Sequence, residues 1–158
     1  MESFSSRHFY CFLFHVCTEN NTNVLIAAQD VRLAGLIQEF LLKTGYKAQC
    51  EMNLDLMLEV LGGTHVDLLI IDGEMPEKVL KDFVETAAKI KPGVPMIAVG
   101  MSEHEVRSKT LSAFVTSFIE KPFSISEISN TIKATLHTHL SKHHVEAQDV
   151  GRSEETLN

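Results

Sequence analysis

The stretch Val66-Asp67-Leu68-Leu69-Ile70-Ile71-Asp72, followed directly by Gly73-Glu74-Met75-Pro76, decides the fold class of this chain. Its unbroken run of apolar residues predicts a short strand buried on both faces, because a half-exposed strand alternates apolar and polar residues. Such strands are typical of the centre of a parallel sheet. Asp72 stands at the carboxyl end of this strand, where open α/β sheets place their ligands and chemistry. Asp72 is therefore a candidate site residue, with capping of the next turn as the alternative.

The segment before this strand shows a regular alternation of strand and helix patterns. Short apolar runs predict strands, and helical spacing of apolar residues between a capping residue and a glycine predicts helices. The expected order is a strand at 24–28, a helix capped by Asp30 and stopped at Gly45, a strand at 46–50, and a helix from Asn53 to Gly62-Gly63.

The segment after Pro76 continues the same alternation. Its two later helices each open on a capping box, in which a serine is followed three residues on by a glutamate. The expected order is a helix to about Lys89, a strand at 95–99, a helix from Ser102 through Leu111, a strand at 117–120, and a helix from Ser124 to about His139 or beyond. Strict alternation predicts an α/β fold with a doubly wound parallel sheet, covered by helices on both faces.

Length and composition fit one domain with tails. The chain has 158 residues, 44% of them apolar, and a formal net charge of −7. We expect an N-terminal extension at residues 1–22, a domain at 23–140 and a polar tail at 141–158. A nucleic-acid surface needs a clustered basic face, so the net charge favours protein partners over nucleic acid.

The N-terminal extension contains an apolar, aromatic run from Phe9 to Val16. The run is far shorter than the roughly 20 residues of a membrane helix, so no membrane span is expected. A signal peptide is an alternative, but no small-x-small cleavage site follows the run. We expect the extension to pack on the domain or to serve self-association, since exposed aromatic residues promote aggregation. Cys11, Cys17 and Cys50 form no CxxC pair, which favours a reducing cytoplasm.

Two motifs give the chain a resemblance to a known family. Asp72 is followed by Met75-Pro76, and the sequence Glu120-Lys121-Pro122-Phe123 follows the last expected strand. In this order and spacing the motifs resemble the receiver domain of two-component response regulators, the fold of the bacterial chemotaxis response regulator. The resemblance covers about residues 23–140. It implies a five-stranded, flavodoxin-like sheet of order 2-1-3-4-5 and a role in signalling and phosphorelay rather than an enzyme's turnover.

The resemblance also implies a role for each site residue. Asp72 would be the phosphoacceptor, and Lys121 would pair with the phosphoryl oxygens and, at rest, with Asp72. Mg²⁺ would neutralise the negative charge, held by Asp72, the backbone carbonyl of Glu74 and acids that follow the first strand. Gly100 and Phe118 occupy the family's two switch positions, which are normally a hydroxyl residue and an aromatic residue.

The sequence departs from the family at several of these positions. The two metal-binding acids fall on Ala28 and Gln29, which carry no charge, and Asp30 lies one residue further on. A site made of Asp72, the Glu74 carbonyl and Asp30 would be a thin one for Mg²⁺. Gly100 removes the switch hydroxyl.

The leading interpretation is a stand-alone, atypical receiver domain that acts through protein–protein contacts, with weak or absent phosphorylation of Asp72. The end of the chain soon after the last helix is the reason for expecting no output domain. Its partners would be a histidine kinase or phosphotransfer protein, or a downstream target. The resemblance also suggests a homodimer through the helix at 102–111, the strand at 117–120 and the last helix. The alternatives are a conventional phospho-accepting receiver with a rearranged Mg²⁺ site, and a small enzyme on the same fold.

A cluster of histidines lies near the last helix, at His137, His139, His143 and His144. His139 and His143 are one helical turn apart, a spacing that suits metal chelation, but no carboxylate or cysteine completes a ligand set. We interpret them as surface residues that favour the helix C-terminus electrostatically.

Overall fold

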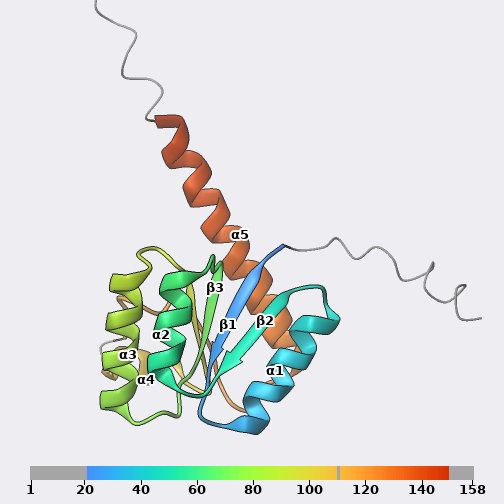
Figure 1. Ribbon diagram of the computed structural model, residues 1–158, viewed down its shortest axis with the longest axis vertical. Coiled ribbons are helices and arrows are strands. Elements are labelled where there is room, and N and C mark those ends of the chain that lie inside the picture. The colour runs from blue at the N-terminus through green and yellow to red at the C-terminus, as the bar shows by residue number, and fades with distance from the viewer. Residues whose placement is uncertain (1–20, 110, 150–158) are drawn as a thin grey trace, which may run out of the picture.

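The computed structural model describes residues 21–109 and 111–149 (Figure 1). Strands and helices alternate along the whole of this part of the chain. In order they are β1 (Asn23–Ala27), α1 (Val31–Lys43), β2 (Lys47–Glu51), α2 (Leu54–Gly63), β3 (Leu68–Asp72), α3 (Glu77–Ile90), β4 (Met96–Val99), α4 (Glu103–Ser108), β5 (Ser117–Ile119) and α5 (Ile125–Asp149).

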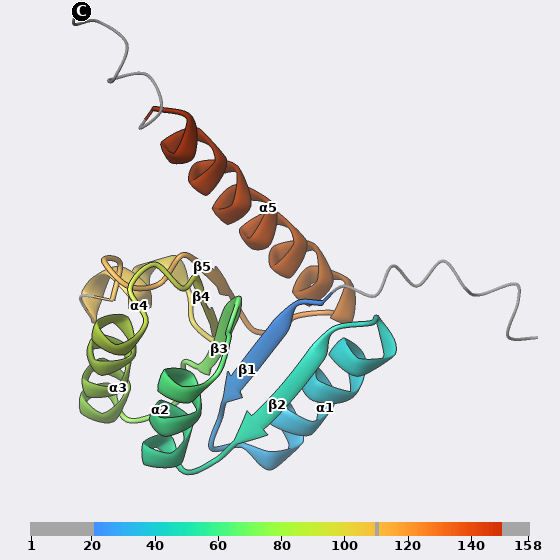
Figure 2. The ribbon, with the colours of Figure 1, turned by 45° about the horizontal axis from the view of Figure 1, so that its top comes forward.

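The five strands form one parallel sheet of order β2-β1-β3-β4-β5. Helices α1 and α5 cover one face of the sheet, and α2, α3 and α4 cover the other (Figure 2). The predicted fold class and strand order are confirmed. Since all strands run the same way, their carboxyl ends meet at one edge of the sheet.

The central strand β3 explains the unbroken apolar run that marks it in the sequence. All of its residues are buried. Leu69 and Ile71 pack among residues of α2 and α3, whereas Leu68 and Ile70 pack among residues of α1 and α5. A strand with helices on both faces has no solvent side, so no polar residue interrupts it.

The predicted helix starts are confirmed by their caps. The side chain of Asp30 accepts hydrogen bonds from the first turn of α1, and Asn53 does the same for α2. Ser102 and Glu105 form a reciprocal capping box at the start of α4. Each cap satisfies backbone N–H groups that the helix itself leaves unpaired.

Helix α4 ends earlier than expected, at Ser108 rather than at Leu111. Helix α5, expected to reach about His139 or beyond, continues through Asp149 and projects beyond the sheet (Figure 1), so residues 141–149 of the expected polar tail have helical backbone. The physical reason is that no glycine or proline interrupts the sequence between Ile125 and Asp149.

The remaining terminal predictions lie outside the described residues, at 1–20 and 150–158. Within the described ranges, no helix combines the length and the apolar character that a bilayer span requires.

Candidate functional site: the crevice at the carboxyl edge

The carboxyl edge of the sheet brings together residues that are far apart in the sequence. Asp72 is the last residue of β3, and its register partner on β4 is Val99. Gly100 follows β4 directly, and its N–H donates to the carbonyl of Ile119 at the end of β5 (2.7 Å). Lys121 lies two residues beyond that point, so the fold places it at the same edge as Asp72.

Asp72 is a buried carboxylate, with 4% of its surface exposed. Its Oδ1 accepts a hydrogen bond from the backbone N–H of Glu74 at 3.0 Å. The turn then leads through Pro76, the N-cap of α3, directly into that helix. Asp72 therefore caps the following turn at the strand end, and its role as a functional site residue stays a prediction.

Lys121 forms its ion pair with Glu74, at 2.6 Å between Nζ and Oε2. The expected resting pair between Lys121 and Asp72 is thus replaced by one with the neighbouring acid. The hydrogen bond to Glu74 raises the pKa of Lys121, burial opposes this rise, and the negative charges of Glu74, Asp72 and Asp30 add to it. The long Glu74 side chain reaches the flexible lysine, whereas the shorter Asp72 is held back by its own turn.

Gly100 lies beneath this ion pair. Its φ of +88° is in the left-handed region, which residues other than glycine rarely adopt. A Cβ placed on Gly100 would lie 3.4 Å from Cγ of Glu74 and 3.4 Å from Cε of Lys121. The residue that lacks the switch hydroxyl is therefore also the residue that makes the backbone turn next to the ion pair.

The end of β1 contributes little charge to the crevice. Ala28 is buried, Gln29 is exposed, and Asp30 uses its Oδ1 to accept from the N–H groups of Arg32 (2.8 Å) and Leu33 (3.3 Å). The described residues contain no group of three or more His, Cys, Asp or Glu side chains arranged to hold a metal ion. The donor set of this crevice therefore fits Mg²⁺ poorly, since that ion needs a near-octahedral shell of oxygen ligands.

Phe118 lies on β5, an edge strand of the sheet, opposite Ala98 of β4. Its side chain is 37% exposed. The aromatic switch position is thus a partly solvent-facing ring rather than a packed core residue.

The structure reveals two features that the sequence did not indicate. One is the ion pair of the Glu74 side chain with Lys121, because Glu74 was considered only as an oxygen ligand for Mg²⁺. The other is Met101, which is fully buried and lies over Gly73: a Cβ on that glycine would fall 2.0 Å from Cγ of Met101. A glycine directly after the site aspartate, with a bulky residue directly after Gly100, is the signal that points to such a contact.

The histidine cluster contributes no metal centre among the side chains that the structure describes. His137 and His139 lie on α5, and the side chains of His143 and His144 lie outside the described set. Their interpretation as surface residues stays a prediction.

Solved structures with this fold include receiver proteins of archaea and bacteria. A CheY-like receiver domain protein from Methanospirillum hungatei JF-1 is 22% identical, with a TM-score of 0.69 over 77% of this chain and 98% of the other. The chemotaxis protein CheY4 of Vibrio cholerae is 17% identical, with a TM-score of 0.65 over 73% of this chain and 98% of its own. The beryllofluoride-activated NtrC4 receiver domain dimer is 20% identical, with a TM-score of 0.65 over 74% and 98%.

The family assignment comes from the sequence itself. No curated protein matches the chain. The family model described as the response regulator receiver domain matches residues 24–133, which run from β1 into the first part of α5 and include every residue of the crevice. The chain therefore belongs to the response regulator receiver domain family, whose members act in two-component signalling.

Proposed function

We propose that this chain is an atypical receiver domain that signals through protein–protein contacts, with Asp72 phosphorylated weakly or not at all. The observation that carries this proposal is the ion pair between Glu74 and Lys121 at the crevice. In this pair Lys121 binds a carboxylate of its own chain, at the place where a lysine of the family would bind phosphoryl oxygens.

Charge balance supports the proposal. A phosphoryl group that approaches Asp72 brings several negative charges, which must be neutralised at the site. With Ala28 and Gln29 in place of acids, the crevice has a weak donor set for a divalent cation. The positive charge of Lys121 would be shared between Glu74 and a phosphoryl group, and the Glu74 carboxylate adds a further negative charge beside that group. Repulsion between two unit charges about 4 Å apart amounts to about 4 kcal/mol at an effective dielectric constant near 20.

The turn at Gly100 adds a second obstacle. A serine or threonine there would have to adopt the left-handed conformation, with its Cβ in van der Waals contact with Glu74 and Lys121. The backbone conformation at Gly100 therefore disfavours the hydroxyl that responds to phosphorylation in the family. The missing acids, the missing hydroxyl and the paired lysine would each weaken phosphorylation of Asp72.

The decisive experiment is phosphorylation by a small phosphodonor. The chain is incubated with Mg²⁺ and the donor, and its intact mass is measured, with Asp72→Ala as the matched control. We expect no stoichiometric gain of a phosphoryl group. A stoichiometric adduct that Asp72→Ala abolishes would contradict the proposal and establish a conventional receiver.

A set of restoring variants identifies which change blocks the site. The double variant Ala28→Asp and Gln29→Asp is expected to recover Mg²⁺ binding, measured by titration calorimetry. Adding Glu74→Gln frees Lys121 and is expected to recover the phosphoryl adduct. If the triple variant is folded and binds Mg²⁺ but gains no phosphate, the turn at Gly100 is the remaining cause.

The conventional receiver is the second candidate, and one observation favours it. Three carboxylates, those of Glu74, Asp72 and Asp30, all act on the pKa of Lys121, so negative charge does gather around the crevice. A rearranged Mg²⁺ site would draw on these three residues. The mass measurement above separates the two candidates.

The proposed partners follow from the family and from the exposed side of the crevice. A histidine kinase or phosphotransfer protein would be the upstream partner, a target protein the downstream one, and the cytoplasm the compartment. A homodimer through α4, β5 and α5 is supported by the exposed ring of Phe118, and the NtrC4 receiver domain mentioned above is a dimer. Sedimentation of the chain and of Phe118→Ser tests it: a dimer that the substitution weakens is expected, and a monomer at all concentrations would refute it.

A further inference from the structure

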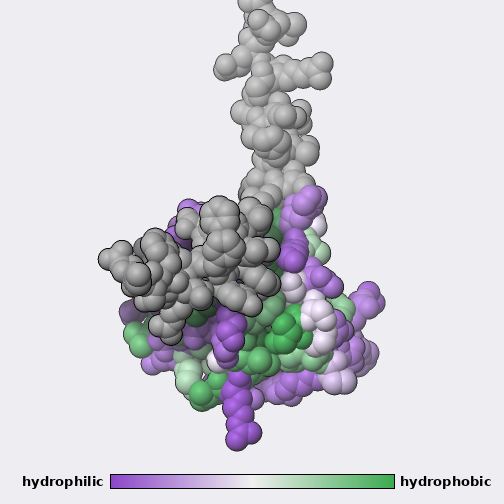
Figure 3. Space-filling view, turned by 90° about the vertical axis from the view of Figure 1, so that its right-hand side faces the viewer, coloured by the Kyte–Doolittle hydropathy of each residue, from purple (hydrophilic) through white to green (hydrophobic). Residues whose placement is uncertain are grey.

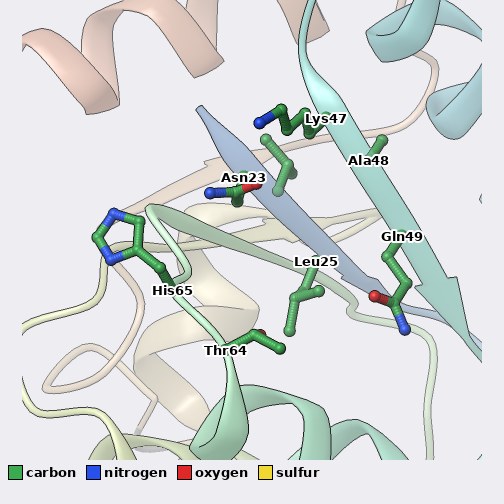
Figure 4. Close-up of a pocket in the computed structure, with 8 residues that line it drawn as sticks. Asn23, Leu25, Lys47, Ala48, Gln49, Thr64 and His65 are labelled. Carbon is green, nitrogen blue, oxygen red and sulfur yellow. The ribbon is translucent and has the colours of Figure 1, made fainter. Parts of the chain in front are cut away.

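A hollow of about 300 Å³ lies at the edge of the sheet opposite the crevice, where β1 and β2 begin (Figure 4). Its lining combines the apolar side chains of Leu25 and Ala48 with the polar side chains of Lys47, Gln49 and His65. None of these residues belongs to the crevice around Asp72. A mixed lining of this kind suits an amphipathic or aromatic side chain, which pairs an apolar body with contacts at its edge or face.

The hollow adjoins an open edge of the sheet. Strand β2 pairs only with β1, so its other side has no strand partner among the described residues. Apolar side chains are exposed next to it: Val31 and Leu42 on α1. They share a helix face with Gln38, whose Nε2 donates to the carbonyl of Ala48 at 3.3 Å, so this face of α1 is turned toward β2.

A second pair of exposed apolar residues, Met52 and Leu56, lies at the carboxyl end of β2, where the chain passes into the first turn of α2. We call β2 together with Val31, Leu42, Met52 and Leu56 the β2 edge. Figure 3 views the molecule from the side where α1 and β2 lie in Figure 1, and apolar residues gather there among polar ones. Exposed apolar residues that cluster in this way are typical of an interaction surface.

The two described residues before β1 lie close to this edge. The carbonyl of Thr22 accepts from the N–H of Lys47 (3.0 Å), and Oδ1 of Asn21 accepts from its Nζ (2.6 Å). The chain thus enters β1 beside the first residue of β2. Four residues separate Val16 from Asn21, and an extended segment of that length spans about 14 Å. Neighbouring strands are only about 4.8 Å apart, so the β2 edge is within reach.

We propose that the aromatic segment Phe9–Val16 of the same chain packs along the β2 edge and covers the hollow. The segment supplies apolar and aromatic side chains that can cover the exposed apolar residues of the edge and enter the hollow, and the Lys47 ammonium offers its rings a cation–π contact. Tethering favours this occupant over a second copy, because a short linker holds the segment at a millimolar effective concentration. The proposal uses no residue of the crevice and is independent of the proposed signalling function.

The test uses the full chain with one reporter. The sequence contains no tryptophan, so Phe12→Trp introduces a single fluorophore into the segment. We expect its emission to be blue-shifted, and its quenching by acrylamide several-fold weaker, relative to the same chain unfolded in guanidinium. Adding Leu42→Lys at the β2 edge is expected to shift the emission to the red and to restore quenching. Adding Val79→Lys, at an exposed apolar position on α3, is the matched control and is expected to change neither.

Each other result overturns the proposal. A reporter that is as accessible in the native chain as in the unfolded one means that the segment does not dock. Shielding that survives Leu42→Lys places the segment elsewhere, and shielding that grows with protein concentration makes a second copy the occupant. Circular dichroism checks that each variant is folded, and if Leu42→Lys is not, Met52→Lys at the other end of β2 replaces it with the same expectations.

Discussion

The strand interior and the crevice at its carboxyl edge meet at Asp72, but different forces hold the two regions. Strand β3 is buried on both faces by helices, whereas the side chains of Glu74 and Lys121 are 53% and 42% exposed. Burial of apolar side chains stabilises the fold by kilocalories per residue, while an exposed ion pair contributes about 0–1 kcal/mol. The stability of the fold therefore depends little on which residues stand at the site.

The largest effect is expected from a substitution in the strand interior. Ile71→Ala removes a fully buried side chain one residue before Asp72 and leaves a cavity between the sheet and α3. We expect a loss of about 2–5 kcal/mol in the free energy of unfolding, measured by urea denaturation. A loss below about 1 kcal/mol would contradict the conclusion that burial of β3 is the main source of stability.

The next effect concerns Gly73, where the interior and the crevice touch. The Cβ of Gly73→Ala would clash with the buried Met101 side chain, and it would lie 3.1 Å from the carbonyl of Val99. We expect a destabilisation of about 1–3 kcal/mol, typical of overpacking. The double variant with Met101→Ala should lose less than the sum of the two single variants. Strict additivity in denaturation experiments would show that the two residues are not in contact.

A smaller effect is expected at the capping box of α4, which borders the crevice. Ser102→Ala removes the cap and should cost about 1 kcal/mol at neutral pH. Hydrogen bonds from the backbone N–H and the hydroxyl of Ser102 lower the pKa of Glu105, so its stabilising contribution is present above the unfolded-state pKa and is lost as the pH falls through the lower folded-state value. The stability difference between wild type and Glu105→Gln should therefore shrink in acid, and a difference that grows on acidification would contradict this sign.

The smallest effect on stability is expected in the crevice itself. Glu74→Gln should change the free energy of unfolding by less than about 1 kcal/mol, because the ion pair is exposed. The same variant should lower the pKa of Lys121 toward its ordinary range, since the hydrogen bond to Glu74 is the main cause of its rise. A side-chain NMR titration of Lys121 measures this shift.

The stability that the Glu74–Lys121 pair contributes should also depend on pH. A raised lysine pKa contributes stability that is present below the unfolded-state pKa and is lost only as the pH rises through the folded-state value. Wild type and Glu74→Gln should therefore differ least in strongly alkaline solution. An unchanged Lys121 pKa in Glu74→Gln would show that the pair is not formed in solution and would remove the main support for an atypical site.

Local signals made most of the fold predictable. The caps at Asp30, Asn53 and Ser102 and the apolar run of β3 each act within a few residues, so the sequence carries them openly. The strand order and the placement of Lys121 near Asp72 came from the family resemblance, and the structure confirms the strand order and brings Lys121 to the same edge. The partner of Lys121 was not predictable, because Glu74 lies 47 residues away and competes with Asp72 over a short distance.

The sequence by itself determined the alternation of strands and helices, the burial of β3 and the loss of charge at Ala28 and Gln29, since these depend on residue type and local spacing. Only the tertiary structure decided that Glu74 takes Lys121, that Gly100 turns beneath that pair with positive φ, and that Met101 covers Gly73. Those contacts join segments whose approach depends on how β3, β4 and β5 pack side by side. A long, flexible side chain such as lysine takes whichever carboxylate that packing brings within reach.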